Sequence, residues 1–398
     1  MSKTIAVNAG SSTLKFKLFD MPSEDVVAEG TIERIGEKMG HAKIKYGNGQ
    51  KHEEDKPFAA HAAAVNYLLD KLIELKIVAS YDEITAVGHR IVAGGEFFKD
   101  STIIDDDVIS KIDELSEYAP LHEPAELVGI KAFRKVLPNA FAVAVFDTSF
   151  HVDMPEMNAL YSVPYDWYEK YGARKYGAHR TRHRYVSARA AEMLGKPIEE
   201  LKLITMYIGA GASITAVKNG KSFDTSMGFT PVAGITMATR SGDVDPSLIA
   251  FMQGKLNLSS DEMIDILNHK SGLLGISGSS PDMRDILAAA EKGDDRAQLA
   301  LDIYVNRIVR YIGAYIAEMG GADAIVFTAG VGENSVPVRK MIADKLGYFG
   351  IKIDQEKNDC HGVERDLSAD DAKIKTLLIP TNEELMIVRD IERLKKNN

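Results

Sequence analysis

Apolar residues along the chain follow two patterns that alternate from one end to the other. Short runs of β-branched and aliphatic residues, of the kind that fill buried strands, are separated by longer stretches in which apolar residues recur every three or four positions. This alternation predicts an α/β fold. The predicted strands cover residues 4–7, 14–19, 84–88, 142–146, 203–208, 213–218, 324–328 and 376–379, and the predicted helices cover 60–75, 123–137, 187–194 and 297–319.

The stretch 297–319 has the clearest helical period. Leu301, Ile308 and Ile312 fall on one face of such a helix, and Gly320 ends it. A continuous apolar stripe of this kind is typical of a helix packed against the core rather than of a cofactor site.

Two segments about half a chain apart resemble each other. Residues 4–20, TIAVNAGSSTLKFKLFD, and residues 203–221, LITMYIGAGASITAVKNGK, both predict a strand, a turn of small residues and a second strand. The repetition suggests duplicated halves. With 398 residues, the chain has the length of two domains that each bury a core of their own.

The charge balance and the single cysteine limit the classes of function. A net charge of −10 and an isoelectric point near 5.6 disfavour a general nucleic-acid binder, although they do not exclude a local basic patch. Cys360 is the only cysteine, so an internal disulfide cannot form and a reducing compartment is expected. The chain has no apolar run of about 18 residues and no signal-peptide pattern at its start, so we expect a cytoplasmic protein without a membrane partner.

Three turns rich in small residues follow predicted strands. They are residues 8–13 (NAGSST), 209–213 (GAGAS) and 328–334 (TAGVGEN). Small residues let backbone N–H groups approach an anion closely, so the three together predict nucleotide binding, although the first two are also typical of plain hairpin turns. The Walker pattern and the protein-kinase signatures are absent, so neither of those classes applies.

Phosphoryl transfer also needs cations and a positioned acid near the transferred group. Candidates occur near strand or loop ends: Arg90, Asp147, His179 and Arg240. An arginine guanidinium binds two oxygens of a carboxylate or phosphate at once. Taken singly, each residue has an ordinary structural alternative, namely a surface ion pair, a loop hydrogen bond or a cap. Catalysis is favoured only because these four residues occur together with three turns that could bind a nucleotide.

Asp243 and Asp245, in the segment SGDVDP, have two interpretations. Both could bind Mg²⁺, because carboxylates are ligands that this ion accepts. They also precede Pro246, where a helix can start, so an N-capping role is at least as well supported. The sequence leaves both interpretations open.

Nine blocks of the sequence together resemble the acetate kinase family. They are VNAGSSTLKFKLFD, GHRIVAGGE, APLHEPAELVGI, AVFDTSFH, YEKYGARKYGAH, DTSMGFTP, TRSGDVDP, FTAGVGENS and IPTNEELMIVRD, over about residues 4–395. The resemblance implies two RNase-H-like domains of the sugar-kinase/actin type with an interdomain cleft, and a homodimer. It also implies Mg²⁺-dependent interconversion of ATP and acetate with ADP and acetyl phosphate. The expected domains are 1–148 with 384–398, and 149–383.

The resemblance assigns roles to individual residues. It implies magnesium-linked residues at Asn8 and Glu383, and catalytic residues at Arg90, His122, Asp147, His179 and Arg240. It implies that acetate lies against Arg90, Val92, Leu121 and Pro231, and that the nucleotide contacts Thr13, Lys15, Gly209, Ala210, Gly211, Gly330, Gly332 and Asn334. A carboxylate nucleophile is already ionised at neutral pH, so Asp147 is expected to orient the acid or a partner arginine rather than to act as a strong base.

Several residues depart from the family's usual pattern beside these positions. They are Tyr207 and Ala93 in place of histidines, Ala178 in place of a frequent phenylalanine, Ala210 in place of a common asparagine, Arg180 and Arg182 in HRTRH in place of HGTSH, and Glu123 and Glu126 in LHEPAE in place of LHNPAN. We hypothesise that one of these two carboxylates pairs with one of the two arginines. The alternative is that all four side chains are unrelated and face solvent.

Two other functions stay open on the same fold. Ala178 would leave more room in the acyl pocket, which suggests a propionate or butyrate kinase. Tyr207, Arg180 and Arg182 suggest instead a catalytically weakened member that only binds nucleotide or dimerises.

Overall fold

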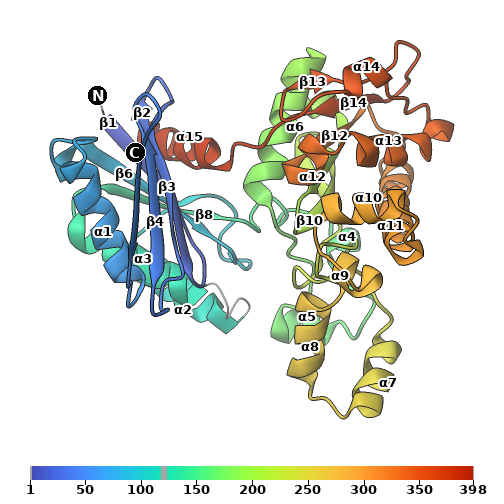
Figure 1. Ribbon diagram of the computed structural model, residues 1–398, viewed down its shortest axis with the longest axis horizontal. Coiled ribbons are helices and arrows are strands. Elements are labelled where there is room, and N and C mark those ends of the chain that lie inside the picture. Colours follow the sequence, from blue (N-terminus) through green and yellow to red (C-terminus); the bar gives the residue numbers. More distant parts are fainter. Residues whose placement is uncertain (1, 118–122, 398) are drawn as a thin grey trace. The chain divides into compact units, whose positions relative to one another are not determined.

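The structure of the protein is a computed structural model that describes residues 2–117 and 123–397. The chain forms two compact units, Met1–Val152 with Asn382–Asn398 (unit 1) and Asp153–Thr381 (unit 2). In Figure 1 the blue N-terminal strands and the red C-terminal helix α15 (Glu383–Lys396) belong to unit 1. The domains expected at 1–148 with 384–398 and at 149–383 stay a prediction.

Unit 1 is built on one mixed sheet with the strand order β5-β4-β3-β2-β1-β6-β8-β7. The strands β1, β2 and β3 are antiparallel, whereas β1, β6 and β8 run parallel to one another. The strands are β1 (Ser2–Ala9), β2 (Thr13–Met21), β3 (Asp25–Glu33), β4 (Gly40–Tyr46), β5 (Gln50–Lys56), β6 (Ile84–Ile91), β7 (Thr102–Ile103) and β8 (Phe141–Phe146). The helices are α1 (His61–Glu74), α2 (Asp106–Glu114), α3 (Glu123–Val136) and α15, with short 3₁₀ turns at Tyr81–Glu83 and Leu115–Glu117.

Helices cover both faces of the unit 1 sheet. Side chains of a strand alternate between faces, so neighbouring residues enter different cores. Ile5 packs in a cluster with Leu68 of α1 and Phe133 of α3, whereas Ala6 packs in a second cluster with Ile387 of α15. The C-terminal helix is therefore part of the core of unit 1.

Unit 2 contains a second mixed sheet, in the order β11-β10-β9-β12-β14-β13. The strands are β9 (Lys202–Ile208), β10 (Ala212–Lys218), β11 (Lys221–Thr225), β12 (Ala324–Thr328), β13 (Arg365–Asp366) and β14 (Lys375–Leu378). The helices are α4 (Glu156–Ala159), α5 (Asp166–Tyr171), α6 (Arg180–Leu194), α7 (Pro246–Leu256), α8 (Ser260–His269), α9 (Gly272–Ser277), α10 (Met283–Glu291), α11 (Asp295–Met319), α12 (Ala329–Asn334), α13 (Val336–Asp344) and α14 (Gln355–Asn358), with 3₁₀ turns at Ile198–Glu200 and Gly347–Phe349.

The predicted apolar helix is confirmed as α11. Its stripe, which includes Ile308 and Ile312, is fully buried against the face of the sheet that carries Ile204 and Ile214. The helix begins at the N-cap Asp294, whose side chain accepts two backbone N–H bonds. The stripe is therefore core, as its period predicts.

The two sheets share one topology, which confirms the α/β class. It also explains why residues 4–20 and 203–221 resemble each other. In each unit three antiparallel strands are followed by two strands parallel to the first, in the order 3-2-1-4-5: β3-β2-β1-β6-β8 and β11-β10-β9-β12-β14. This is the RNase-H-like arrangement. The repeated segments 4–20 and 203–221 form the first hairpin of each sheet, β1–β2 and β9–β10.

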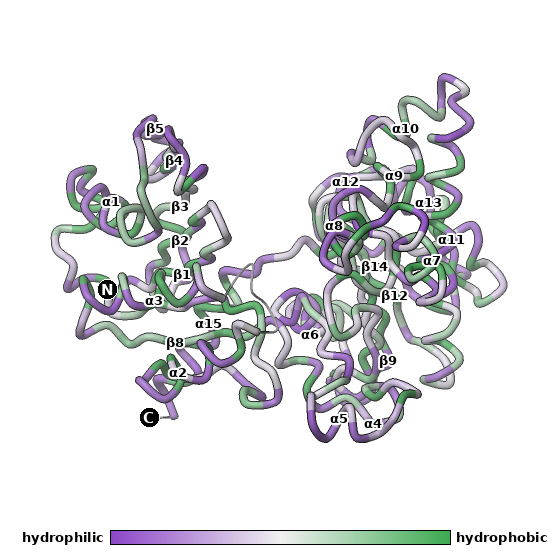
Figure 2. The backbone as a smooth tube through the Cα atoms, turned by 90° about the horizontal axis from the view of Figure 1, so that it is seen from below, coloured by the Kyte–Doolittle hydropathy of each residue, from purple (hydrophilic) through white to green (hydrophobic). Residues whose placement is uncertain are grey.

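The eight predicted strands are confirmed, but other elements differ from the prediction. The helix expected at 187–194 begins seven positions earlier, at Arg180, where polar residues hide the helical period. The turn expected at 328–334 is largely the short helix α12. Sequence reasoning also missed β5, which consists only of polar residues and is hydrophilic throughout in Figure 2.

In the part of the chain that the structure describes, we find no helix with the length and apolar character needed to cross a membrane.

Candidate functional site

Three predicted residues of unit 1 meet at the carboxyl ends of neighbouring parallel strands. Asn8 lies near the end of β1, Arg90 lies near the end of β6 and Asp147 directly follows β8. Nη1 of Arg90 donates to Oδ1 of Asn8 over 3.1 Å, and Nη2 of Arg90 pairs with Oδ2 of Asp147. Nε of Arg90 lies 2.8 Å from Oε1 of Glu383, at the start of α15. The ends of parallel strands thus gather this group, the Arg90 cluster.

Negative charge surrounds Arg90 on several sides. Its side chain is only 16% exposed, and that of Asp147 is 2% exposed. Burial alone would lower the pKa of Arg90, but the charges of Asp147 and Glu383 outweigh it and raise that pKa well above its usual value. Each terminal nitrogen of Arg90 uses one N–H in these contacts, so one N–H on each can still reach a substrate oxygen.

The donor set of this cluster suits magnesium. Mg²⁺ prefers oxygen ligands and is usually held by one or two protein side chains together with substrate phosphates and water. Asn8 and Glu383 supply an amide and a carboxylate oxygen beside Arg90. Among the described residues no group of three or more His, Cys, Asp or Glu side chains forms a metal site. One amide and one carboxylate oxygen match the small number of protein ligands that Mg²⁺ takes when phosphate oxygens and water supply the rest.

A side chain of α1 fixes the first turn that is rich in small residues. Gly10 closes the β1–β2 hairpin by donating its N–H to the carbonyl of Thr13 over 2.8 Å. Nε2 of the buried His61 donates to the carbonyl of Gly10 over 2.6 Å. Sequence reasoning missed His61, because nothing in its local pattern links it to Gly10, 51 residues earlier in the chain.

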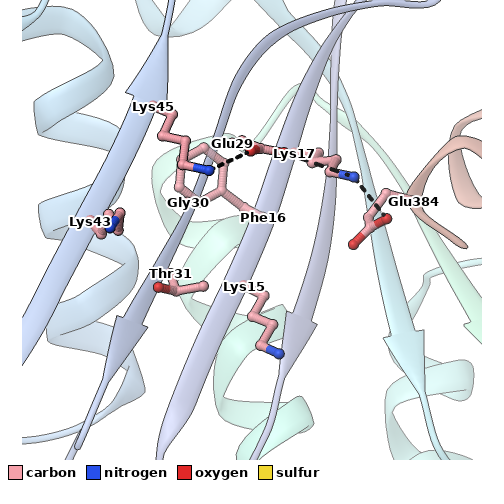
Figure 3. Close-up of a pocket in the computed structure, with 9 residues that line it drawn as sticks. All are labelled: Lys15, Phe16, Lys17, Glu29, Gly30, Thr31, Lys43, Lys45 and Glu384. Atoms are coloured by element: carbon pink, nitrogen blue, oxygen red, sulfur yellow. Dashed lines mark hydrogen bonds and ion pairs between the residues drawn. The ribbon is translucent and has the colours of Figure 1, made fainter. Parts of the chain in front are cut away.

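Lys15 follows this turn on β2 and lines a pocket of about 240 Å³ on the polar face of β2, β3 and β4 (Figure 3). In the same pocket Lys17 pairs with Glu384 over 3.3 Å and Lys45 pairs with Glu29 over 3.4 Å. Lys15 forms no ion pair with any described residue, so its charge is available to an anion. Its predicted contact with the nucleotide, like that of Thr13, stays a prediction.

The expected acyl wall is described only in part. Leu121 and His122 lie outside the described residues. The N–H of Val92 donates to Oε2 of Glu126 over 3.1 Å. Since the side chains of Glu126 and Arg180 are both about 2% exposed, the interpretation that all four substituted residues face solvent is wrong for these two. The proposed pairing between the two segments stays a prediction.

In unit 2, the turn Gly209–Gly211 lies beside two predicted catalytic side chains. A Cβ atom on Gly211 would lie 3.6 Å from Nη1 of Arg240 and 3.9 Å from Nε2 of His179. His179 has the left-handed backbone conformation with φ of 62° at the start of α6, which is uncommon for a residue with a side chain and clusters at functional sites. The glycine turn, His179 and Arg240 therefore form one group, the His179 cluster.

Arg240 is a partly buried cation to which the described part of the chain offers no counter-ion. It forms no ion pair with any described residue, and burial lowers its pKa. Among the described residues, its Nη1 lies near two acceptors, the carbonyl of Pro231 at 3.5 Å and the sulfur of Met237 at 4.0 Å. A partly desolvated guanidinium without an acid is a ready receptor for an anion, because an arriving anion restores the lost interactions.

Tyr207 contacts two side chains, His179 of the His179 cluster and Arg182. Its ring centroid is 4.2 Å from that of His179, and the guanidinium carbon of Arg182 lies 4.8 Å from the Tyr207 ring on a cation–π contact. Tyr207 and Arg182 stand at positions where the sequence departs from the family resemblance. The substitutions are thus in contact with one another and with a predicted catalytic residue.

The nucleotide residues predicted near Gly330 lie on α12. A Cβ atom at Gly330 would meet nothing within 4 Å, so a ligand can approach its backbone, whereas Gly332 packs against Phe327 and Ile208. The side chain of Asn334 donates to the carbonyl of Gly330 over 2.9 Å. Their predicted nucleotide contacts, and those of Gly209, Ala210 and Gly211, stay a prediction.

The two acids of SGDVDP have structural partners. Asp245 is the N-cap of α7 and accepts the N–H of Ser247 over 2.7 Å. Asp243 accepts the N–H of Gly234 over 2.8 Å and the hydroxyl of Tyr311 over 2.6 Å. The capping interpretation is confirmed for Asp245, and Asp243 ties the loop that carries Arg240 to α11.

Comparison with known proteins decides the family. The model of the Acetokinase family matches residues 3–389. The chain is 77% identical to the acetate kinase of Limosilactobacillus fermentum over all of both chains, and 62% identical to that of Lactiplantibacillus plantarum over all of both chains. The chain belongs to the acetokinase family.

Solved structures of this family have the same fold. The crystal structure of acetate kinase from Porphyromonas gingivalis matches with a TM-score of 0.95 at 44% identity, over 99% of this chain and 100% of that one. A propionate kinase from Francisella tularensis matches with a TM-score of 0.92 at 39% identity, over 98% and 99% of the two chains. Membership of the acetokinase family, inferred from the sequence blocks, is thus confirmed.

Proposed function

We propose that this chain is an acetate kinase that transfers the terminal phosphoryl group of ATP to acetate and catalyses the reverse reaction. Its high identity to proteins named acetate kinase, over the full length of both chains, supports this activity. The observation that carries the chemistry is Arg240, a partly buried guanidinium that has no acidic partner among the described residues and lies beside His179 and the turn at Gly211.

The reaction needs positioning and charge stabilisation more than acid–base chemistry. The ionised acetate oxygen forms a bond to the terminal phosphorus as the bond from that phosphorus to the ADP oxygen breaks. In this proposal Arg240 and His179 stabilise the charge on the transferring phosphoryl oxygens. Arg90 orients the carboxylate with its remaining N–H groups, while Asp147 holds Arg90 in place rather than accepting a proton.

Asn8 and Glu383 are the residues that would hold magnesium in this proposal. The ion supplies charge neutralisation on the phosphates of ATP when it is bound. Their shared contact with Arg90 would link the ion to the residue that orients the acid.

Acetate is the acceptor that we favour over a longer acid. The relatives at 77% and 62% identity are both named acetate kinase. Ala178, which motivated a larger acyl pocket, is 8% exposed and packs within the hydrophobic core of unit 2, which supports a structural role for this residue.

We further propose a cytoplasmic homodimer that associates through α7 and α8. The helix α7 has an apolar composition but no buried residue, and Leu248, Phe251 and Leu256 are each about half exposed. Apolar surface of this kind is typical of a protein interface. The single cysteine supports the cytoplasmic assignment, because a chain that cannot form an internal disulfide is typical of a reducing compartment.

A hydroxamate assay of acetyl phosphate formation tests the activity. The wild-type chain should form acetyl phosphate from ATP, Mg²⁺ and acetate, with propionate and butyrate used less efficiently. The variant Arg240→Ala should lose about 100-fold or more in kcat/KM for acetate, the loss typical when one preorganised charge donor is removed from a transition state.

The matched control is Arg284→Ala, because the Arg284 side chain is 89% exposed and forms an ion pair with nearby Asp282 on the surface. This variant should keep the wild-type rate. A wild-type chain that forms no acetyl phosphate, or an Arg240→Ala variant with unchanged kcat/KM, would contradict the proposal.

A further inference from the structure

The side chain of His179 is connected to a row of buried polar groups behind it. Nδ1 of His179 lies 2.8 Å from the hydroxyl oxygen of Ser213, and that oxygen lies 2.7 Å from Nε2 of His183. Nδ1 of His183 lies 2.7 Å from the hydroxyl oxygen of Thr205. The groups thus form a continuous chain of hydrogen bonds, the histidine relay, which runs from His179 to Thr205.

The relay is built into the secondary structure of unit 2. Thr205 on β9 and Ser213 on β10 face α6, because they alternate with Ile204, Met206 and Ile214, which face the α11 core. His183 lies one turn after His179, so both imidazoles reach the same serine. Ser213, Thr205 and His183 are completely buried. Water does not compete for these bonds, so their direction is set by the protein.

One acceptor at the far end gives the relay a direction. The hydroxyl of Thr205 donates to the backbone carbonyl of Thr215 over 3.4 Å, and a carbonyl can only accept. Thr205 must therefore accept from the Nδ1–H of His183. Nε2 of a neutral His183 is then an acceptor, so the Ser213 hydroxyl donates to it and accepts from the Nδ1–H of His179.

We propose that Ser213 and His183 are positioning residues that hold the proton of neutral His179 on Nδ1 and orient Nε2 toward Gly211 and Arg240. Nε2 of His179 is the nitrogen near Gly211 and Arg240. When His179 takes up a second proton, Nε2 becomes a donor while the bond from Nδ1 to Ser213 is unchanged. His179 can therefore gain a donor for an anionic oxygen without rearranging its support. Its catalytic use rests on the proposed function.

The nitrogen spectrum of the imidazoles tests the relay without reference to activity. Long-range ¹H–¹⁵N correlations of ¹⁵N-histidine-labelled protein distinguish Nδ1–H from Nε2–H rings. The spectra are recorded at a pH high enough for His179 to be neutral. Signals are assigned with His179→Gln and His183→Gln. We expect both rings as Nδ1–H in the wild type, and loss of the fixed Nδ1–H state of His179 in Ser213→Ala. An Nε2–H ring for His179 in the wild type would overturn the proposal.

Kinetics separate a positioning role from a structural one. Ser213→Ala should lower kcat about 10-fold with little change in KM for ATP, the scale of one hydrogen bond to an ionised group in the transition state. The matched control is Ser226→Ala, which removes another buried serine hydroxyl from the same region, where it accepts the N–H of Ile214 over 2.9 Å. This control should keep kcat within about twofold.

Different results would contradict the positioning role of Ser213 and the proposed kinase function. Equal losses of kcat in Ser213→Ala and Ser226→Ala would mean that Ser213 only supports the fold, and would overturn the positioning role. A wild-type chain without kinase activity would overturn the proposed function, while the ¹⁵N spectra would still decide the direction of the relay.

Discussion

At the scale of single residues, the two arginines of the candidate site differ in their surroundings. Arg90 is partly buried beside the amide of Asn8 and the carboxylates of Asp147 and Glu383, and its pKa is raised. Arg240 is partly buried and has no acidic partner among the described residues, and burial lowers its pKa. The first is held in place before any ligand arrives, whereas the second gains most from binding an anion. The sequence presents them as equivalent candidates, since side-chain environment depends on contacts from distant segments.

His89, the buried residue next to Arg90, predicts that the stability of the fold depends on pH. Burial lowers the pKa of His89 from 6.5 to about 3. The unfolded chain therefore takes up a proton near pH 6.5 that the native chain refuses, so this group destabilises the fold as pH falls from about 6.5 toward 3.

The variant His89→Leu tests this contribution. Urea unfolding followed by circular dichroism should show that the free energy of unfolding falls less steeply with acid in the variant, by up to about 1.4 kcal/mol per pH unit between pH 6 and pH 4. Equal slopes for the wild type and the variant would show that His89 is protonated in the native state.

At the scale of elements, the packing of α15 on β6 positions part of the Arg90 cluster. Gly88 lies on β6, two residues before Arg90, and Glu383 lies at the start of α15. A Cβ atom at Gly88 would overlap Cγ2 of Ile387 and lie 2.9 Å from Cδ1 of Ile391. The absence of a side chain at this one position allows the helix to approach the strand and bring Glu383 to Arg90.

The variant Gly88→Ala should therefore lower both stability and activity. Overpacking of this kind costs about 1–3 kcal/mol, and displacement of α15 would weaken the contact of Glu383 with Arg90. Adding Ile387→Ala should recover part of the loss, because it removes the overlapping methyl group.

A double-mutant cycle of unfolding free energies measures this coupling. Gly88→Ala and Ile387→Ala should couple favourably. Strictly additive losses would contradict direct contact between the two positions.

At the scale of the whole molecule, the apolar surface of α7 and α8 predicts a defined oligomer. Leu248 and Phe251 on α7 and Ile264 on α8 are between 49% and 59% exposed. We expect light scattering after gel filtration to give about twice the chain mass of 43.6 kDa. Leu248→Asp with Phe251→Asp should shift the mass to that of one chain, because a charge in an apolar interface is costly to desolvate.

The control for this experiment is Tyr348→Asp, at a side chain that is 97% exposed in unit 2. It should leave the mass unchanged. A wild-type chain that scatters as a monomer would remove the proposed interface.

Much of the framework follows from the sequence alone. The periodicity of apolar residues predicts the eight core strands and the long helix α11, because burying one face of an element imposes a repeat that can be read locally. The echo of the first hairpin predicts two similar halves, and the family blocks predict the acetokinase family, which is confirmed. The periodicity of apolar residues does not predict polar elements such as β5 and the first turn of α6, since their stability depends on partners elsewhere in the fold.

Only the tertiary structure decides how the candidate residues are connected. It brings Asn8, Arg90 and Asp147 together because parallel strands end at the same edge of a sheet. It also joins His179 to His183 through Ser213, although the serine lies thirty residues away on a different element. Hydrogen-bond partners and burial depend on which surfaces pack together, and a local sequence pattern carries no record of that packing.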